Sequence, residues 1–314
     1  MLSNLLRRSR SALAITVATG ALLTVGAPAE AAVSGPPTLA ASAFLMDGTT
    51  GATLSSKLGD TKREVASTTK IMTAYVVLTT PGLDLNKRVT VRQEHLDYVY
   101  LQGGSSAGLK AGATPTVRRL LYGMMLPSGC DAAYALADTF GSGTTRAARV
   151  KDFIAKMNAK AKTLGMTNTT YDSFDGISPT GANLTTARDL AKLTRAAMKG
   201  STFKAIVKTP SYSSDGTSTI ATWLNTNLLI KPGHAYQTPG AIGVKTGSGT
   251  ASGQCLVFSV TRNGKTIIGV LLKSDDRYPD AIKLTNWALG APDGAPAGAK
   301  LQRSFTEPIP DVLD

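Results

Sequence analysis

The chain has 314 residues, of which 42% are hydrophobic and 18% charged, and its formal net charge is +13. That length and composition are typical of a globular protein with one or two ordinary hydrophobic cores. With two cysteines in the whole chain, a fold that depends on a disulfide framework is excluded.

The first thirty or so residues have the features of a signal peptide. A basic region that contains Arg7 and Arg8 precedes an uncharged, mostly apolar run over 11–27, and small-residue cleavage signals follow. The alternative, a membrane anchor, normally needs about 20 apolar residues, and this run is shorter and contains Thr and Gly. We therefore predict a signal peptide over 1–31 and an exported protein, at the outer face of the membrane, in the cell wall or secreted.

The mature chain stays strongly basic, and such a charge suits an anionic partner. For an exported protein, a membrane surface or an acidic wall polymer fits better than nucleic acid, which we do not expect as a partner. The charge also fits simple solubility, because Lys and Arg are scattered and form no dense run.

The mature chain begins with strands and a helix. Residues 43–46 and 52–57 flank a turn rich in Gly and Thr and predict a hairpin. A helix is predicted from 68 to 78, with Ser67 at its start. Residues 88–91 form a short strand candidate.

Helical patterns occupy the middle of the chain. Apolar residues recur at helical spacing over 117–124 and 150–164, and Thr185 or Thr186 caps a further helix. These patterns predict a helical insert over about residues 92–205.

Strand patterns return near the C-terminus. An Asn-Gly pair between two runs rich in β-branched residues is a strong hairpin signal. A helix over 278–289 and a Pro/Gly-rich tail over 291–314 complete the chain. The strand runs are 241–245, 254–262 and 265–273.

These elements predict an α+β fold over residues 32–290. We expect an antiparallel sheet flanked by the terminal helices, beside an all-helical subdomain. The active site is expected in the cleft between them, where ligands usually bind.

Ser67 and Lys70 form the first chemical motif. Residues three apart share a helix face, so the hydroxyl and the amine are presented together. A serine becomes a nucleophile when a neighbour takes its proton, and a lysine can do so only when neutral. Lowering the lysine pKa from about 10.4 to about 7 requires roughly 4 to 5 kcal/mol, which burial and a second cation supply. Taken alone, the pair is more typical of a helix cap followed by a solvated lysine.

Two further motifs follow, and their order along the chain is informative. Ser-Gly-Cys at 128–130 lies on a turn between helical runs, and Lys-Thr-Gly at 245–247 ends a β-rich run. Penicillin-recognising serine enzymes carry Ser-x-x-Lys, Ser-x-Asn and Lys-Thr-Gly in this order. Over about residues 38–290 the sequence resembles low-molecular-weight penicillin-binding proteins. These are serine D-alanyl-D-alanine carboxypeptidases and transpeptidases that share their fold with class A β-lactamases.

The resemblance implies three catalytic residues. Ser67 would be the nucleophile that forms the acyl-enzyme, and Lys70 would accept its proton. Ser128 would relay the proton toward the leaving amine. No cofactor and no metal are implied.

The resemblance also implies substrate-binding residues. Lys245 and Thr246 would hold the terminal carboxylate of a peptide ending in D-Ala-D-Ala, and Lys245 would be the second cation. Gly247 would allow close approach of the substrate. The backbone amides of Ser67 and Ser248 would form the oxyanion hole. The implied partners are a peptidoglycan stem peptide, an amine acceptor and β-lactam inhibitors.

Cys130 departs from the family pattern, which has Asn there, and is similar to the Ser-Gly-Cys motif of one DD-transpeptidase in the family. A thiol is a poorer hydrogen-bonding group than a carboxamide. Our hypothesis is that hydrolysis suffers more than transfer to a bound amine, so that the enzyme is mainly a transpeptidase. A thiol in the cleft is also expected to react with alkylating reagents. Cys255 lies mid-strand and is expected to be a core residue, not a disulfide partner.

Other functions fit the sequence less well. A class A β-lactamase needs a deacylating Glu, and no Glu lies between Ser128 and Lys245, so β-lactam turnover would be slow. A Ser-His-Asp hydrolase or a zinc enzyme would have to use His95 or His234, and the ligand spacings of a zinc site are absent. A basic wall-binding protein with a degenerate site is the non-enzyme alternative, and Cys130 is its best argument.

Overall fold

A computed structural model describes residues 35–292 of the chain. These residues fall within one compact unit, 32–314. The predicted signal peptide, 1–31, and nearly all of the predicted tail, 291–314, lie outside the described residues. Both therefore stay predictions.

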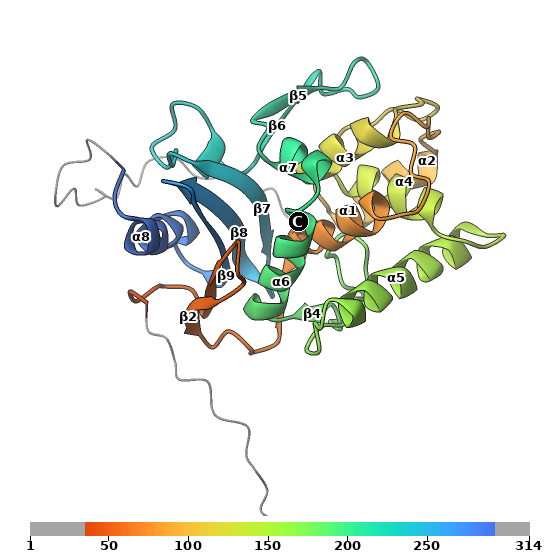
Figure 1. Ribbon diagram of the computed structural model, residues 1–314. Coiled ribbons are helices and arrows are strands. Elements are labelled where there is room, and N and C mark those ends of the chain that lie inside the picture. The colour runs from red at the N-terminus through yellow and green to blue at the C-terminus, as the bar shows by residue number, and fades with distance from the viewer. Residues whose placement is uncertain (1–34, 293–314) are drawn as a thin grey trace, which may run out of the picture. The chain divides into compact units, whose positions relative to one another are not determined.

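The centre of the fold is a five-stranded antiparallel sheet with the strand order β2-β1-β9-β8-β7 (Figure 1). The first two strands come from the start of the domain and the other three from its end, so the sheet joins segments that are far apart in the sequence. The strands are β1 (Ser42–Asp47), β2 (Thr53–Lys57), β7 (Ala241–Gly249), β8 (Gly253–Arg262) and β9 (Lys265–Ser274).

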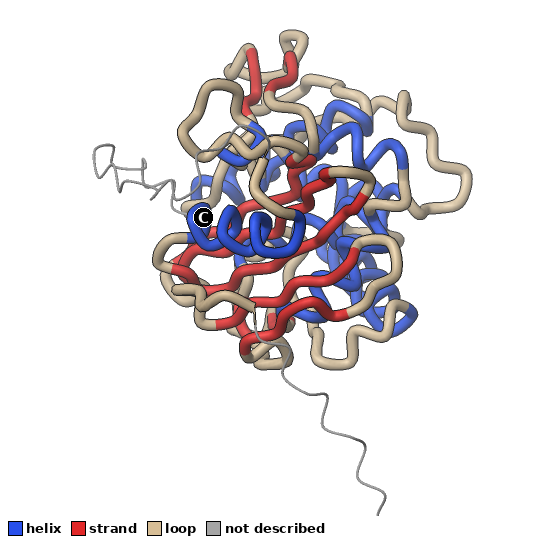
Figure 2. Tube along the Cα trace, turned by 60° about the vertical axis from the view of Figure 1, so that its left-hand side comes forward, coloured by secondary structure: helices blue, strands red, loops and turns tan. Residues whose placement is uncertain are grey.

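Both faces of the sheet are buried because helices cover each of them. Figure 2 shows α8 (Arg277–Leu289) crossing one face, with the other helices behind the sheet. Alternation along the strands separates two cores. Phe258 belongs to the core under α8, whereas its neighbour Val257 belongs to the larger core on the helical side.

The helical part lies beside the sheet and surrounds α1 (Lys70–Leu78), which packs against α3, α4, α5, α6 and α7. Its helix α6 also packs on β1 and β9 and thereby covers the inner face of the sheet. The helices are α2 (Gln93–Gln102), α3 (Val117–Met125), α4 (Cys130–Phe140), α5 (Arg146–Thr163), α6 (Ala187–Ala197) and α7 (Ser201–Val207).

Short elements complete the described chain. Two 3-10 turns and two small two-stranded sheets lie between the larger elements. They are η1 (Ala66–Thr69), η2 (Leu228–Ile230), the pair β3 (Arg63–Glu64) and β4 (Leu184–Thr185), and the pair β5 (Ser211–Ser213) and β6 (Thr222–Leu224).

The predicted α+β architecture is confirmed, including the two hairpins of the sheet. Asn263 and Gly264 both have positive φ, 50° and 73°, as a tight two-residue hairpin turn requires. The strand expected over 88–91 does not form, because only one bridge, Arg88 to Thr116, pairs it. The sequence predicts that both terminal helices flank the sheet. The last helix, α8, does so, but the inner face is covered by α6, and the first helix, α1, is enclosed by other helices.

Among the described residues, none of the helices combines the length and the apolar character needed to cross a membrane.

Gly269 of β9 lies opposite Phe258 of β8, and a Cβ atom at Gly269 would lie 2.1 Å from Phe258 Cζ. Gly269→Ala is therefore expected to lower the free energy of unfolding by about 1 to 3 kcal/mol, because the ring must move in a filled core. Urea-induced unfolding measures the change.

Gly200→Ala is the matched control. A Cβ atom there meets nothing nearer than 3.4 Å, and at this helix start the change costs under about 1 kcal/mol. Equal losses in the two variants would contradict the packing argument.

Candidate active site

The site forms where the edge strand β7 meets the turn η1 that precedes α1. A Cβ atom at Gly247 would lie only 2.7 Å from the carbonyl oxygen of Val65 and 3.2 Å from the backbone nitrogen of Ser67. Only glycine permits such an approach. Gly247 thus brings β7 directly beside the first motif.

Ser67 and Lys70 are in direct contact within this turn. The amine Nζ of Lys70 donates a hydrogen bond of 2.6 Å to Ser67 Oγ. Ser67 is 2% exposed and Lys70 is fully buried. The predicted pairing of hydroxyl and amine is therefore present, and the alternative of a solvated lysine is wrong.

Ser128 connects the two lysines of the site. It precedes α4, and its Oγ lies 3.4 Å from Lys70 Nζ and 3.0 Å from Lys245 Nζ. Ser128 has a φ of 69°, in the left-handed region. Such a conformation is unfavourable for serine and is often found at functional sites.

The Lys-Thr-Gly motif lies along β7. Lys245 is 1% exposed, and its Nζ also donates a 3.0 Å hydrogen bond to the carbonyl oxygen of Thr246. The hydroxyl of Thr246 lies 2.7 Å from that of Thr226. Ser128 therefore joins the amines of the first and third motifs, and Thr246 follows Lys245 on the same strand.

Arg277 at the start of α8 is a site residue that the sequence did not reveal. Its Nη1 donates to the carbonyl oxygens of Gly247 (3.0 Å) and Cys255 (3.2 Å) and to Ser248 Oγ (3.1 Å). These contacts fix the end of β7. An arginine just before the predicted helix over 278–289 carries no motif, so only the fold identifies it.

Asp175 is a second residue that was missed. It is fully buried, accepts a 2.9 Å hydrogen bond from the Tyr98 hydroxyl and a 3.0 Å bond from the backbone nitrogen of Ile177. Burial raises the pKa of Asp175, and the nearby charge of Lys70 opposes that shift. Asp175 therefore contributes to the electrostatic environment of Lys70.

Cys130, the first residue of α4, is also completely buried. Its Sγ lies 3.9 Å from the carbonyl oxygen of Ser128, a weak contact. Burial raises the pKa of the Cys130 thiol, while Lys70 lowers it. Cys130 and Cys255 are both unbridged, which confirms that they form no disulfide. The expectation that Cys130 lies open in the cleft is wrong, because the side chain is fully enclosed, with Lys70 and Asp175 among its neighbours.

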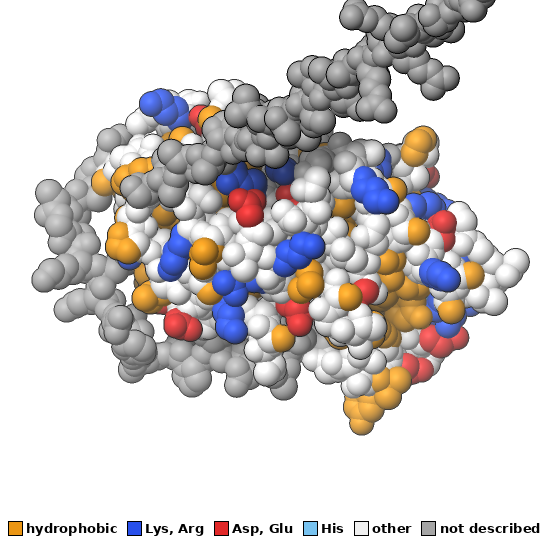
Figure 3. All heavy atoms as spheres, turned by 90° about the horizontal axis from the view of Figure 1, so that it is seen from below, with side chains coloured by type: hydrophobic (Ala, Val, Ile, Leu, Met, Phe, Trp, Pro, Cys, Tyr) orange, Lys and Arg blue, Asp and Glu red, His pale blue; other side chains and the backbone are white. Residues whose placement is uncertain are grey.

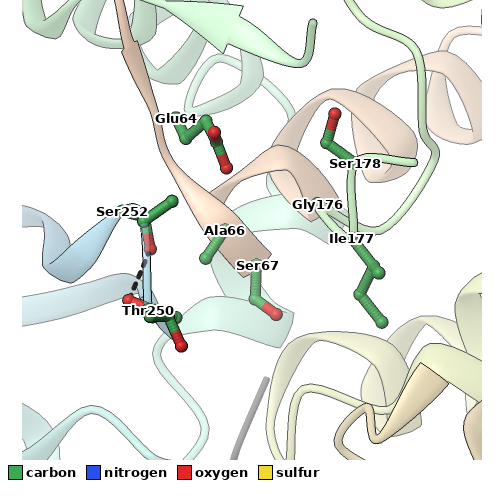
Figure 4. Close-up of a pocket in the computed structure, with 10 residues that line it drawn as sticks. Glu64, Ala66, Ser67, Gly176, Ile177, Ser178, Thr250 and Ser252 are labelled. Carbon is green, nitrogen blue, oxygen red and sulfur yellow. Dashed lines mark hydrogen bonds between the residues drawn. The ribbon is translucent and has the colours of Figure 1, made fainter. Parts of the chain in front are cut away.

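A cavity of about 130 Å³ opens beside Ser67, and neither Lys70 nor Lys245 is among the residues that line it. It is bounded on one side by the β7–β8 turn and on the other by the loop around Gly176 (Figure 4). The lining residues are Glu64, Ala66, Ser67, Gly176, Ile177, Ser178, Gly249, Thr250, Ala251 and Ser252.

Within residues 35–292, no group of three or more His, Cys, Asp or Glu side chains is arranged to hold a metal ion.

Residues 29–276 match the family model described as D-alanyl-D-alanine carboxypeptidase. The chain belongs to this family. The predicted recognition of a serine D-alanyl-D-alanine carboxypeptidase is thus confirmed, and membership favours an enzyme over a non-catalytic wall-binding protein.

Individual relatives agree with this assignment. The chain is 50% identical over 292 residues to the D-alanyl-D-alanine carboxypeptidase of Streptomyces sp. (strain K15), covering 89% of this chain and 98% of that protein. It is 34% identical over 247 residues to the D-alanyl-D-alanine carboxypeptidase DacB2 of Mycobacterium tuberculosis, covering 74% and 77%. The crystal structure of the Streptomyces K15 DD-transpeptidase matches with a TM-score of 0.77 and 50% identity, covering 82% of this chain and all of that one.

The burial of the two cysteines predicts that neither is alkylated in the folded protein. Burial raises the pKa of Cys255 to about 11, so its reactive thiolate is scarce at neutral pH as well as enclosed. Intact mass after treatment with iodoacetamide at pH 8 should show no adduct on the native protein and two after unfolding. Alkylation of native Cys130 would contradict the burial of its side chain.

Proposed function

We propose that this chain is an exported serine enzyme that acts on peptidoglycan stem peptides ending in D-Ala-D-Ala. It forms an acyl-serine intermediate and passes the acyl group to an amine acceptor or to water. The observation that carries the proposal is the 2.6 Å hydrogen bond between Lys70 Nζ and Ser67 Oγ in a buried site. Family membership supports the same substrate class.

In the first step, Ser67 Oγ attacks the carbonyl carbon of the penultimate D-Ala. Neutral Lys70, whose Nζ contacts Ser67 Oγ, takes the hydroxyl proton. The conditions that favour a neutral lysine are burial and a neighbouring cation. Both apply, since Lys70 is fully buried and Lys245 reaches the same Ser128 hydroxyl.

In the second step, the peptide bond breaks and the leaving D-Ala nitrogen needs a proton. Ser128 Oγ is within 3.4 Å of Lys70 Nζ, so the proton taken from Ser67 can pass through Ser128 to that nitrogen. An ester between Ser67 and the remaining peptide is left, and free D-Ala departs.

Lys245 and Thr246 are proposed to hold the carboxylate of the departing D-Ala. An amine and a hydroxyl are suitable donors for a carboxylate. The requirement for a carboxylate at this point explains why a peptide must end there, and it gives the carboxypeptidase specificity. β-Lactams carry a carboxylate too and are expected to enter the same place.

The oxyanion of the tetrahedral intermediate is proposed to bind the backbone amides of Ser67 and Ser248. Gly247 brings these two segments together, because its Cα faces the backbone nitrogen of Ser67. Contacts of this kind typically contribute about 3 kcal/mol each to transition-state binding.

Deacylation completes the cycle when water or an amine attacks the ester. The chain has no Glu between Ser128 and Lys245, so a penicilloyl ester lacks the activated water of class A β-lactamases. We therefore propose that β-lactams act as slow-release inhibitors and not as good substrates.

Export and a wall location are proposed from the predicted signal peptide and the substrate. A basic patch for a wall polymer or a membrane is less well supported. On the face of the described residues in Figure 3, Lys and Arg side chains are interspersed with Asp and Glu. On that face the basic side chains therefore form no separate patch.

Incubation with benzylpenicillin should add one molecule to the purified mature protein, and Ser67→Ala should abolish the adduct. The adduct is expected to be an ester of the Ser67 hydroxyl, and no other side chain is expected to form it. Intact mass spectrometry measures it, with circular dichroism showing that the variant is folded. Absence of an adduct on folded wild-type protein would overturn the proposed function.

Cys130→Asn should shift the products toward hydrolysis. Cys130 does not face the cleft, but its thiol interacts with Lys70 and Asp175. A carboxamide there hydrogen-bonds more strongly than a thiol and should hold Lys70 more firmly for the attack of water, so we expect the ratio of free-acid product to transfer product to rise several-fold. The ratio is measured with a D-Ala-D-Ala peptide in the presence of glycylglycine as acceptor. An unchanged ratio in a variant that still forms the penicillin adduct would refute the role assigned to Cys130.

A further inference from the structure

The cavity beside Ser67 has a defined place along β7. Lys245 comes first on this strand, Gly247 follows next to Ser67, and Gly249 at the strand's end lines the cavity. Lysine amines, nucleophile and cavity are therefore arranged in that order along one edge strand.

A bound peptide must follow the same order. In the proposed function, its terminal carboxylate lies at Lys245 and its reacting carbonyl at Ser67. Extended peptides commonly bind by lying along a free strand edge, and β7 is the edge of its sheet. At about 3.3 Å per residue, the residue that precedes D-Ala-D-Ala then lies beside Gly249 and the cavity.

Glu64 is the one ionisable side chain among the residues that line this cavity. In Figure 4 its carboxylate is directed toward the space that Ala66, Ser67 and Gly176 border. The other polar lining groups are the hydroxyls of Ser67, Ser178, Thr250 and Ser252.

The carboxylate of Glu64 makes no contact that stabilises the described fold. Its backbone pairs with Leu184 in the two-stranded β3–β4 sheet, but within residues 35–292 its side chain has no hydrogen bond or ion pair. The neighbouring Arg63 is directed elsewhere, since its Nε donates a 2.8 Å hydrogen bond to Ser42 Oγ. A half-buried carboxylate without a partner, beside a cavity, is suited to bind a cation of the substrate.

We propose that Glu64 selects acyl donors that carry a positively charged side chain on the residue before D-Ala-D-Ala. This inference rests on the proposed function. The site then has opposite charges at its two ends: the Lys245 amine for the terminal carboxylate and Glu64 for the side-chain cation. A peptide with that charge pattern is held in one direction only.

The amine acceptor is a different ligand and does not use this cavity. It must attack the ester from the place that the departing D-Ala has left, because transfer to an amine reverses the geometry of amine release. That place lies on the side of Ser128 and Lys245. Glu64 therefore discriminates among donors, not among acceptors.

Two synthetic peptides test the inference. Both have an acetylated α-amine and end in D-Ala-D-Ala, and they differ in the preceding residue: trimethyl-lysine, which is cationic and cannot act as an acceptor, or Nε-acetyl-lysine, which is neutral. The measurement is kcat/KM for D-Ala release. Wild type should prefer the cationic peptide by about three- to tenfold, as a partly exposed ion pair permits. In Glu64→Gln the preference should disappear, because kcat/KM falls for the cationic peptide and is unchanged for the neutral one.

Glu94→Gln is the matched control, because Glu94 is an exposed residue that pairs with Arg146 in the helical region. It should keep the wild-type preference. Glu64→Lys should reverse the preference when a glutamyl peptide is compared with the cationic one. Formation of the penicillin adduct shows that each variant is folded.

The outcomes separate the two proposals. A wild-type enzyme that forms the penicillin adduct and releases D-Ala equally well from both peptides would overturn the inference and leave the proposed function intact. A preference that survives in Glu64→Gln would also overturn it. A folded wild-type protein that neither forms the adduct nor releases D-Ala would overturn the proposed function and the inference together.

Discussion

The structure of the site depends on one buried polar contact, in which the Ser128 hydroxyl lies between the amines of Lys70 and Lys245. Two like charges in a buried place are unfavourable unless hydroxyls and carbonyls surround them and one amine gives up its proton. The same arrangement suits the proposed chemistry. Burial and a second cation are the conditions that favour a neutral lysine, which a serine nucleophile needs as its proton acceptor. The three residues come from α1, the turn before α4, and β7, so the contact exists only when the sheet and the helical part are joined.

Several features hold these three segments in place. The positive φ values of Ala66 and Ser128 are unfavourable for non-glycine residues and persist only where packing fixes them. Gly247 allows β7 to approach the serine turn, and Arg277 ties the end of the same strand to β8 through Cys255. Asp175 adds a buried carboxyl group near Lys70. The environment of the reacting groups is therefore built by residues outside the motifs.

The edge strand β7 gives the site its direction. Because it has a free edge and passes the lysines, the nucleophile and the cavity in sequence, it can present a peptide to all three at once. The β7–β8 turn and the loop around Gly176 close the far end from two sides. A loop that approaches this closely requires glycine, since a Cβ atom at Gly176 would lie 2.0 Å from the carbonyl oxygen of Ala66.

The sequence by itself determined what local patterns encode. Asn263-Gly264 between two runs rich in β-branched residues identified β8 and β9, helical spacing identified α3 and α5, and the three ordered motifs identified the family and the candidate site residues. Tertiary structure alone decided what depends on distant segments meeting. The burial of Cys130, the contact of Arg277 with β7, and the positions of Asp175 near Lys70 and of Glu64 beside the cavity are not visible in any sequence pattern, because side-chain burial and long-range contacts arise only after the elements pack.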